Sequence, residues 1–305
     1  MHLHSAVARQ GLLNASQTMT IETQKSCRVT VLKDKLYCVY VVDEDQLFIT
    51  SRTRAGAWSE SEDLGTRSLS GLPAVFTHDD KVYVHASGDY SDPTLGMSSG
   101  TTLCIYNPVN GALDRKIAYG TYGTPSVVEH RGRFHMFWRQ NPAGQVLCAN
   151  STNGSYWYPG PGLYPDGAGQ PTLKSSRDVV ACVYQGLIHV FYMTEAGLCL
   201  IRFDGESGWS RGQLFIDKFY TEMPSVVVHD GMLIVAFADT SQDGIGNTIS
   251  VLPGAQSLGN EGGIDLYRYD GHVVSSVDRS IGIVAEGAPA CGVLDGELNL
   301  IFPGV

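Results

Sequence analysis

The sequence predicts an all-β fold, a six-bladed β-propeller that occupies residues 1–305 as a single domain. Three observations carry this prediction: a short hairpin pattern occurs six times, its copies recur at a regular interval, and the composition suits a large β domain. Hydrophobic residues make up 43% of the 305 residues, and 35 glycines and 13 prolines supply turns. A chain of this length can bury a large core, and radial repetition lets it do so without dividing into domains.

Each copy of the hairpin is a short β-branched run, a turn at Gly or Asp, and an alternating strand. Clear copies start at Pro73, Pro125, Pro224 and Pro289, and degenerate copies start at Cys27 and Val179. In five copies the second strand ends in a large apolar residue, whereas the copy that starts at Pro73 has Ala86 there. The five large residues are Tyr40, Trp138, Tyr192, Phe237 and Phe302.

The blades are therefore expected to start near residues 27, 73, 125, 179, 224 and 289. These starts are roughly 45 to 65 residues apart, and the interval that wraps from 289 through the chain ends to 27 is of similar length, as a ring of four-stranded blades requires. A second, outer hairpin should follow each of the first five inner hairpins. Its turns are expected near Gly56, Gly111, Gly154, Gly205 and Gly271.

The outer hairpin of blade six is expected at the N-terminus. Residues 2–8, a turn at Gly11 and residues 17–22 have the strand pattern, so residues 1–26 would complete the blade that begins at residue 289. An N-terminal outer hairpin paired with a C-terminal inner hairpin closes the ring and leaves no exposed sheet edge.

The charge of the chain excludes some partners. The net charge is −10 and no run of Lys or Arg occurs, which argues against nucleic acid and anionic membranes. No stretch approaches eighteen consecutive apolar residues, and the N-terminus lacks the basic-then-apolar order of a signal peptide. We therefore expect a soluble protein, cytoplasmic or secreted without a leader, although Asn14, Asn150 and Asn153 begin triplets that would accept N-glycans in a secreted protein.

Neither a metal nor a cofactor is expected. The seven cysteines fall in predicted strands without ligand spacing, which favours buried free thiols. His78, His130 and His229 recur at one position beside the hairpin turn and should support turns rather than converge on zinc. Asp239 to Gly244 resembles the first half of a calcium loop, but Ser250 stands where such a loop has its bidentate Glu.

Polar residues are predicted to gather at one mouth of the central channel. Two long connections, 87–100 and 238–263, should either overhang this mouth or be disordered. The polar or aromatic residues that precede inner strands or follow second strands are Tyr122, Arg139, Asp178, Glu195, Tyr220, Glu222, Asp239 and Glu286. Carboxylates crowded at a pocket shift one another's pKa, which separates general acid from general base. Acidic loops on an acidic protein can also be ordinary solvated surface.

The first functional hypothesis is a single-site enzyme or binder that acts on a compact organic or glycosidic substrate by metal-free acid/base chemistry, as a hydrolase or a biosynthetic cyclase. Glu222 and Glu286 are the expected acid and base, and Arg139 would hold an anionic or carbonyl group. The residues expected to contact substrate are Tyr122, Trp138, Asp178, Tyr220 and Asp239.

The alternative hypothesis is a carbohydrate-binding lectin with sites between blades. Trp58, Trp157 and Trp209 each follow a glycine in the outer turn, where they either offer platforms to sugar rings or pack between blades. The run from Arg133 to Arg139, with the residues that follow as far as Trp157, resembles a blade of the six-bladed fungal fucose-binding lectins.

That resemblance implies a sugar site made by an Arg on strand two, a Glu on strand three and a Trp on strand four. Arg133 and Trp157 match this pattern, whereas Cys148 stands about where the Glu should be, and the other blades lack a clear Arg. The hairpin also resembles the repeats of sialidase-like propellers, without their arginine triad or Asp-box signature.

The pattern of repetition favours the first hypothesis. A lectin gains avidity by repeating its polar site, whereas this chain repeats its core positions and varies its mouth loops, as a single asymmetric pocket requires. A small-molecule or glycan ligand is expected in either case. A protein-interaction scaffold remains a third possibility.

Overall fold

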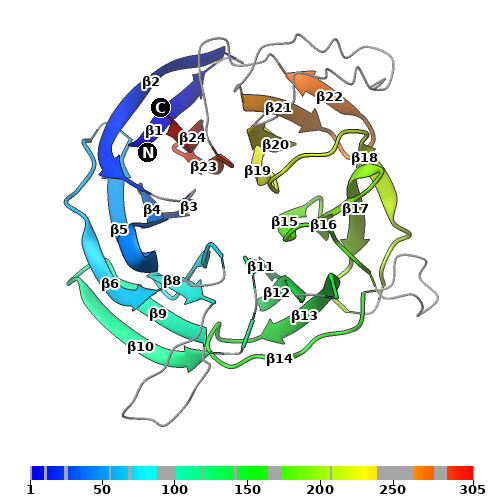
Figure 1. The fold of residues 1–305 in the computed structure, drawn as a ribbon, viewed down its shortest axis with the longest axis horizontal. Helices are drawn as coiled ribbons and strands as arrows, with labels where there is room; N and C mark the ends of the chain where they lie inside the picture. Colours follow the sequence, from blue (N-terminus) through cyan, green and yellow to red (C-terminus); the bar gives the residue numbers. More distant parts are fainter. Residues whose placement is uncertain are drawn as a thin grey trace.

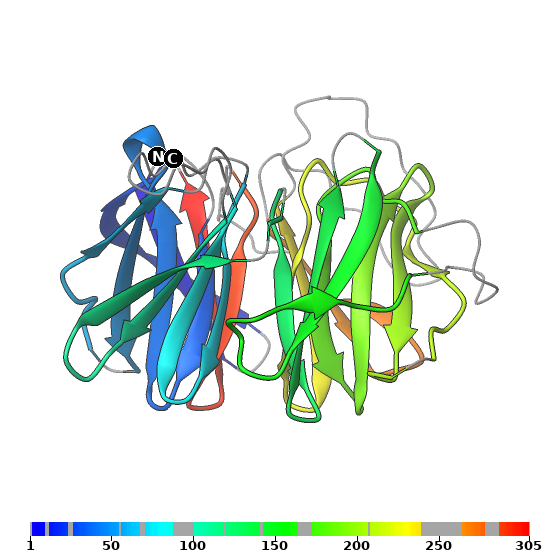
Figure 2. The same cartoon turned by 90° about the horizontal axis from the view of Figure 1, so that it is seen from below.

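The computed structural model describes the chain outside residues 1, 10–11, 24–26, 55, 68–70, 88–100, 119, 122, 141–142, 164–172, 207, 239–263, 278–286 and 305. The described residues form strands β1 to β24 and one short 3-10 helix, η1 (Asp43–Asp45). The strands make six four-stranded antiparallel sheets arranged around a central axis (Figure 1). Seen from the side, the strands run between the two faces of the ring (Figure 2). The predicted six-bladed β-propeller is confirmed.

Blades one to five follow chain order from the inner strand to the outer strand. Blade one is β3 (Arg28–Leu32), β4 (Lys35–Val41), β5 (Gln46–Thr53) and β6 (Glu62–Arg67); blade two is β7 (Ala74–His78), β8 (Lys81–Ala86), β9 (Thr101–Asn107) and β10 (Ala112–Ala118). Blade three is β11 (Ser126–His130), β12 (Arg133–Gln140), β13 (Gln145–Ser151) and β14 (Tyr158–Pro159). Blade four is β15 (Val180–Tyr184), β16 (Leu187–Thr194), β17 (Gly197–Phe203) and β18 (Gln213–Ile216); blade five is β19 (Ser225–His229), β20 (Met232–Ala238), β21 (Ile264–Tyr269) and β22 (Val274–Val277).

Blade six combines the two ends of the sequence. Its sheet order is β2 (Leu12–Glu22), β1 (His2–Arg9), β24 (Glu297–Gly304) and β23 (Ala290–Leu294). Strand β1 pairs with β24 from His2 opposite Gly304 to Ala8 opposite Leu298, and Leu3 is fully buried. The N-terminal outer hairpin therefore shares a sheet with the C-terminal inner hairpin, as expected. Strand β2 begins at Leu12, earlier than the sequence pattern predicts.

The inner hairpins turn through the same two-residue geometry. In blades two to six both central residues have positive φ, as type I′ turns require. In blade five, for example, Asp230 has φ 51° and Gly231 has φ 73°. Asp, Asn and Gly adopt this conformation most readily, which explains why Gly or Asp marks each repeat. Because the turn fixes the register, equivalent residues of each blade occupy equivalent positions.

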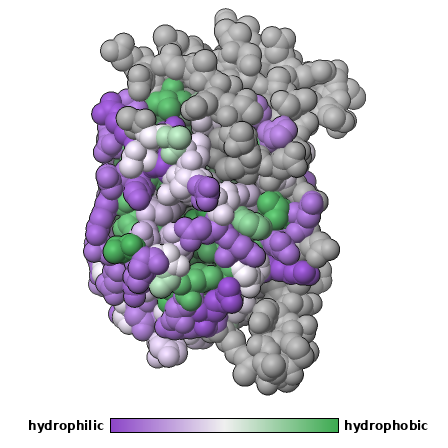
Figure 3. Space-filling view, turned by 90° about the vertical axis from the view of Figure 1, so that its left-hand side faces the viewer, coloured by the Kyte–Doolittle hydropathy of each residue, from purple (hydrophilic) through white to green (hydrophobic). Residues whose placement is uncertain are grey.

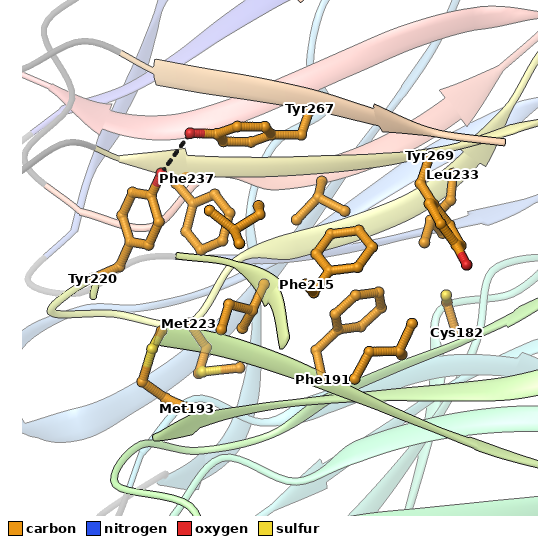
Figure 4. Close-up of a cluster of buried hydrophobic side chains, with 14 of the residues drawn as sticks. Cys182, Phe191, Met193, Phe215, Tyr220, Met223, Leu233, Phe237, Tyr267 and Tyr269 are labelled. Carbon is orange, nitrogen blue, oxygen red and sulfur yellow. Dashed lines mark hydrogen bonds between the residues drawn. The ribbon is translucent and has the colours of Figure 1, made fainter. Parts of the chain in front are cut away.

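Within the described residues the core consists of six hydrophobic clusters, one between each pair of neighbouring blades. The residue that ends the second strand lies in a different cluster in each blade, so each interface contains one of the six. These residues are Tyr40, Ala86, Trp138, Tyr192, Phe237 and Phe302, and all are buried. In the interface between blades four and five, the ring of Tyr220 lies against Phe237 and the Tyr220 hydroxyl is bonded to that of Tyr267 (Figure 4).

The cysteines are free and buried, as predicted. Six lie in strands, and Cys27 immediately precedes β3. Burial raises the pKa of the Cys104, Cys148 and Cys291 thiols to about 12. On the side of the ring shown in Figure 3, hydrophilic residues predominate and hydrophobic ones form small separate groups. Among the described residues, no helix has the length and apolar character that crossing a membrane requires.

Candidate functional site at the mouth of the channel

A cavity of about 160 Å³ lies on the central axis, at the end where the six inner strands begin. Its wall contains the first residues of every inner strand, and these residues differ from blade to blade. By register the six equivalent positions are Arg28, Ala74, Ser126, Val180, Ser225 and Ala290. Five of the blades place a small or apolar residue here, so Arg28 alone among the six brings a charge to the wall.

Arg28 was not among the predicted site residues, although it is the charged residue among the described residues that line the cavity. Burial lowers the pKa of its guanidinium, and electrostatic interactions with Cys27, Asp178 and Glu222 partly offset this shift. The side chain remains protonated, because the ordinary pKa of arginine is far above neutrality. Arg28 lines the cavity, and among the described residues its side chain has no hydrogen-bond partner. The sequence signal was the single Arg at a position that the other repeats fill with Ala, Ser or Val.

Asp178 and Glu222, two of the predicted residues, lie near Arg28 and also connect neighbouring blades. The Asp178 Oδ2 atom in blade four accepts a hydrogen bond from the Thr124 N–H in blade three at 3.1 Å. Gly123, with φ 70°, permits this approach because a Cβ there would lie 2.6 Å from Asp178 Oδ1. The Glu222 Oε2 atom in blade five accepts a hydrogen bond from the Ala288 N–H, just before blade six, at 2.7 Å.

Serine hydroxyls make a second set of contacts between blades at the cavity wall. Ser126 Oγ accepts a hydrogen bond from the Ala181 N–H, and Ser225 Oγ accepts one from the Cys291 N–H, both at 2.9 Å. Each hydroxyl keeps a proton that it can donate to a ligand oxygen. The wall of the cavity therefore combines one guanidinium and two hydroxyls, with two carboxylates within electrostatic range of that guanidinium.

Arg139 and Tyr220 are held by other contacts. Arg139, at the end of β12, donates from Nε to the carbonyl oxygen of Ser175 at 2.9 Å, which ties blade three to the segment leading into blade four. Tyr220 is buried, and its hydroxyl bonds Tyr267 at 3.0 Å and Asp265 at 3.4 Å. Lys218 pairs with the same Asp265 carboxylate. Tyr220 is thus part of the interface between blades four and five.

The tryptophans also lie between blades. Trp138 and Trp157 are 4% and 7% exposed and belong to the cluster between blades two and three. Trp58 packs between blades six and one, and Trp209 stacks on Phe203 between blades three and four, with 4.2 Å between ring centroids. Trp58, Trp157 and Trp209 therefore pack between blades, which is one of the two roles expected of them. Trp138, which was expected to contact substrate, is also buried at such an interface. Arg133, at the start of β12, is exposed.

Three predicted site residues, Tyr122, Asp239 and Glu286, lie outside the described residues, as do the calcium-like segment from Asp239 and most of both long connections. Glu195 is exposed in the turn after β16. No group of three or more His, Cys, Asp or Glu side chains within the described ranges is arranged to hold a metal ion.

Sequence reasoning also missed His135 and His189. Both are 2% exposed, and both occupy the third position of the second strand, where blades one and two have Tyr37 and Tyr83. Burial is the main cause that lowers the pKa of each imidazole to about 4. By contrast, His78 and His229 lie beside the inner turns and face the carboxylates of Asp79 and Asp230, as expected of turn-supporting residues.

Comparisons with known proteins identify a shared fold. No family model matches the sequence, and a search of curated proteins also found no match. Similar solved structures include a sialidase from Trypanosoma rangeli, with a TM-score of 0.59, 9% identity, and coverage of 94% of this chain and 55% of that chain. The lectin BP39L from Burkholderia pseudomallei has a TM-score of 0.57, 15% identity, and coverage of 95% and 81%. YjhT has a TM-score of 0.53, 10% identity, and coverage of 91% of each chain.

This chain thus spans about half the length of the sialidase and most of the length of the lectin. The expected resemblance to lectin and sialidase propellers is confirmed at the level of the fold.

Proposed function

We propose that this protein binds one sugar-sized substrate at the channel mouth and acts on it by acid/base chemistry that needs no metal. The observation that carries the proposal is Arg28, a guanidinium on the wall of the axial cavity, close to two carboxylates from other blades. No repeat requires this residue for packing, because Ala, Ser or Val serves at the equivalent positions.

The size of the cavity limits what can enter it. Its volume is about 160 Å³, close to the roughly 150 Å³ of an engineered protein cavity that binds benzene. One six-membered ring fits such a space, and a long chain does not. A substrate would therefore place one ring, or one terminal sugar unit, in the channel.

The polar groups suit a ring that carries hydroxyls. The Arg28 guanidinium and the Ser126 and Ser225 hydroxyls can donate hydrogen bonds, and the Asp178 and Glu222 carboxylates can accept them. Two of the similar structures bear the names sialidase and lectin, which favours a sugar over other compact polar compounds. Hydrolysis of a glycoside and cyclisation of a biosynthetic intermediate remain the two candidate reactions.

The proposed roles follow from position. Glu222 is exposed at the mouth, where it can exchange protons with solvent, and it would share the acid and base roles with Glu286. Arg28 would orient the ring, and Arg139 would help to hold a substrate group outside the cavity. Asp178 would accept from a ring hydroxyl through the oxygen that Thr124 does not occupy.

The lectin is the second candidate. Arg133 is exposed and Trp157 lies on the turn where the resemblance implies a sugar contact. The Trp157 ring, however, packs edge-on against Phe76, with 6.4 Å between centroids. Sugar binding there would need the indole to become accessible.

A matched pair of Arg→Gln variants separates the two candidates. Thermal-shift titrations with neutral monosaccharides and sugar acids would be run on the wild type, Arg28→Gln and Arg133→Gln. A ligand at 100 times its Kd stabilises the folded state by about 2.7 kcal/mol. We expect a ligand-dependent rise in Tm that Arg28→Gln abolishes and Arg133→Gln retains. The opposite result would transfer the site to the space between blades, where Trp157→Ala should then abolish binding.

Catalysis is tested separately once a substrate has been found. Glu222→Gln keeps an oxygen that can accept from the Ala288 N–H but cannot act as an acid or base. We expect this variant to bind substrate and to lose most turnover. If Glu222→Gln and Glu286→Gln both turn over substrate at the wild-type rate, the catalytic assignment fails while the binding assignment stands.

A further inference from the structure

The outer edge of blade three carries an exposed aromatic pair that the channel site does not use. Tyr156 and Tyr158 are 70% and 65% exposed, whereas Trp157 between them is 7% exposed. Tyr156 lies in a bend and Tyr158 begins β14, and the exposed, buried, exposed order of residues 156–158 indicates that the two tyrosines lie on the side opposite the buried indole. The other large hydrophobic residues that are exposed in the described parts of the chain lie singly on other segments. They are Val109, Leu214, Phe219, Val228 and Val273.

The segment that bears the pair is fixed at its first end. Asn153 Oδ1 accepts hydrogen bonds from the Ser155 and Tyr156 N–H groups, each at 3.0 Å. Gly154, with φ 68°, lies so close to blade two that a Cβ would be 3.0 Å from Phe76. Together with the Trp157 contact to Phe76, these interactions fasten the turn to the neighbouring blade.

Its second end is fixed to the sheet. Tyr158 pairs with Asn150 across β13 and β14, and the Gly160 N–H donates to the Cys148 carbonyl oxygen at 2.8 Å. Directly opposite residues of paired strands lie on the same side of a sheet, so the side chains of Asn150 and Tyr158 project from the same face. The segment therefore carries two aromatic rings and one amide on a backbone that is held at both ends. Because this backbone is already ordered, less conformational entropy is lost when a ligand binds.

The charge of this region indicates the chemistry of the ligand. From residue 140 to residue 165 the sequence contains no Asp, Glu, Lys, Arg or His, although the whole chain has a net charge of −10. Gly, Pro, Tyr and Asn are its commonest residues. A protein partner or a charged polymer would normally meet complementary charges at its rim. An uncharged polyhydroxyl chain can bind such a surface without ion pairs. Its apolar faces can pack on the tyrosine rings, and its hydroxyls can form hydrogen bonds with the amide and hydroxyl groups.

We propose that Tyr156, Tyr158 and Asn150 form a docking surface for a neutral polysaccharide chain on the outer edge of blade three, at β14 (Figure 1). The two rings lie on either side of Trp157 in the sequence, so together they can contact more than one sugar unit. The surface is open, in contrast to the channel, and several units must contribute to binding. The site goes beyond the proposed function, because it does not depend on Arg28 or on turnover.

Affinity electrophoresis tests the proposal. Native gels would contain soluble neutral polysaccharides, namely β-glucan, galactomannan or arabinoxylan, with pectin and heparin as charged comparisons. We expect the wild type to be retarded by at least one neutral polymer, and Tyr156→Ala/Tyr158→Ala to lose at least 80% of that retardation without a change in Tm. Phe219→Ala, which removes an aromatic ring that is 46% exposed elsewhere, is the matched control and should be retarded like the wild type.

Arg28→Gln distinguishes this surface from the channel and should keep its retardation. Loss of retardation in Arg28→Gln with retention in the tyrosine double variant would place the polymer at the channel and overturn the proposal. A wild type that no neutral polymer retards would also overturn it, as would retardation by the charged polymers alone. Co-purification of a protein that the double variant releases, without any effect of polysaccharide, would assign the surface to a protein partner instead.

Discussion

At the interface between any two neighbouring blades, the end of the second strand contributes one buried residue, and in five of six interfaces this residue is large and apolar. At the wall of the channel, the first position of the inner strand contributes Arg, Ala, Ser, Val, Ser and Ala in turn. Both sets of residues come from the inner hairpin of each blade: the channel residues from its first strand and the interface residues from its second strand. The interface position has a similar residue in most blades, whereas the channel position does not.

This difference separates the residues that hold the ring together from the residues that line the channel. Every interface must fill a similar gap between similar sheets, so a similar side chain recurs. A ligand on the axis touches each blade from a different direction, so each blade can contribute a different group. Variants of the repeated position should therefore affect stability, and variants of the channel wall should affect binding.

The largest effect is expected from Phe237→Ala. Phe237 is 1% exposed and stacks on Tyr220, with 3.7 Å between ring centroids. Removing a buried phenylalanine ring costs about 3–5 kcal/mol of the free energy of unfolding. Urea denaturation would measure the loss. Phe219→Ala, whose ring lies partly in solvent on the segment leading into the same blade, should cost less than about 1 kcal/mol. Equal losses would show that the repeated position does not carry the interface.

Acid should weaken two interfaces through His135 and His189. Their folded-state pKa values are lowered to about 4, below the ordinary value of about 6.5. The unfolded chain therefore binds protons first as the pH falls, so stability is present above about pH 6.5 and is lost between about 6.5 and 4. Each histidine contributes on the order of 2–3 kcal/mol across that range.

Thermal unfolding between pH 7.5 and 5 measures this effect. The double variant His135→Gln/His189→Gln should be less stable at pH 7.5 but should lose less stability on acidification. His229→Gln, at a turn where the imidazole is nearer to solvent, is the control and should keep the wild-type slope. A double variant whose Tm falls with pH as steeply as the wild type would assign the acid sensitivity to the carboxylates instead.

The fold was predictable because its signal repeats. The blade starts, the inner turns and the apolar residue at the end of the second strand each occur several times, so single deviations such as Ala86 did not obscure the pattern. The N-terminal outer hairpin followed from ring closure, although the start of β2 did not, because the residues from Leu12 onward alternate weakly.

The candidate site was less predictable, because each residue that lines the channel occurs once and has no repeated pattern to mark it. Asp178 and Glu222 were predicted from their place before inner strands, and the structure places both within electrostatic range of Arg28. Arg28 was missed because it lies in the degenerate repeat that starts at Cys27, where the hairpin pattern is weak and the equivalent positions in other blades are uncharged. The sequence allowed Trp157 to be either a sugar platform or a core residue. Its packing against Phe76, which only the three-dimensional structure shows, places it in the core. The exposed tyrosines that flank it gave no periodic signal at all.

The contacts between blades at the channel mouth should contribute an intermediate amount. Glu222→Ala removes the acceptor of the Ala288 N–H and should cost about 1–2 kcal/mol, because a partly buried donor loses its partner. Glu222→Gln should recover most of this loss, since its amide oxygen can still accept. Urea midpoints of the two variants compare the effects. If both variants lose the same stability, the charge of Glu222 rather than its hydrogen bond connects the blades.

The smallest effect is expected at the opposite end of the inner hairpins, where the turns of blades one and two are joined by an ion pair between Lys33 Nζ and Asp80 Oδ2 at 3.0 Å. Both side chains are more than 60% exposed, and solvent-exposed pairs contribute roughly 0–1 kcal/mol. Lys33→Met should therefore change the urea midpoint by less than Glu222→Ala does, and added salt should reduce the difference from the wild type further. A larger cost for Lys33→Met than for Glu222→Ala would mean that the turn ends, rather than the mouth, fix the spacing of the blades. In that case the carboxylates at the mouth would contribute little to stability, and the only argument for their role in binding would be that they lie close to Arg28.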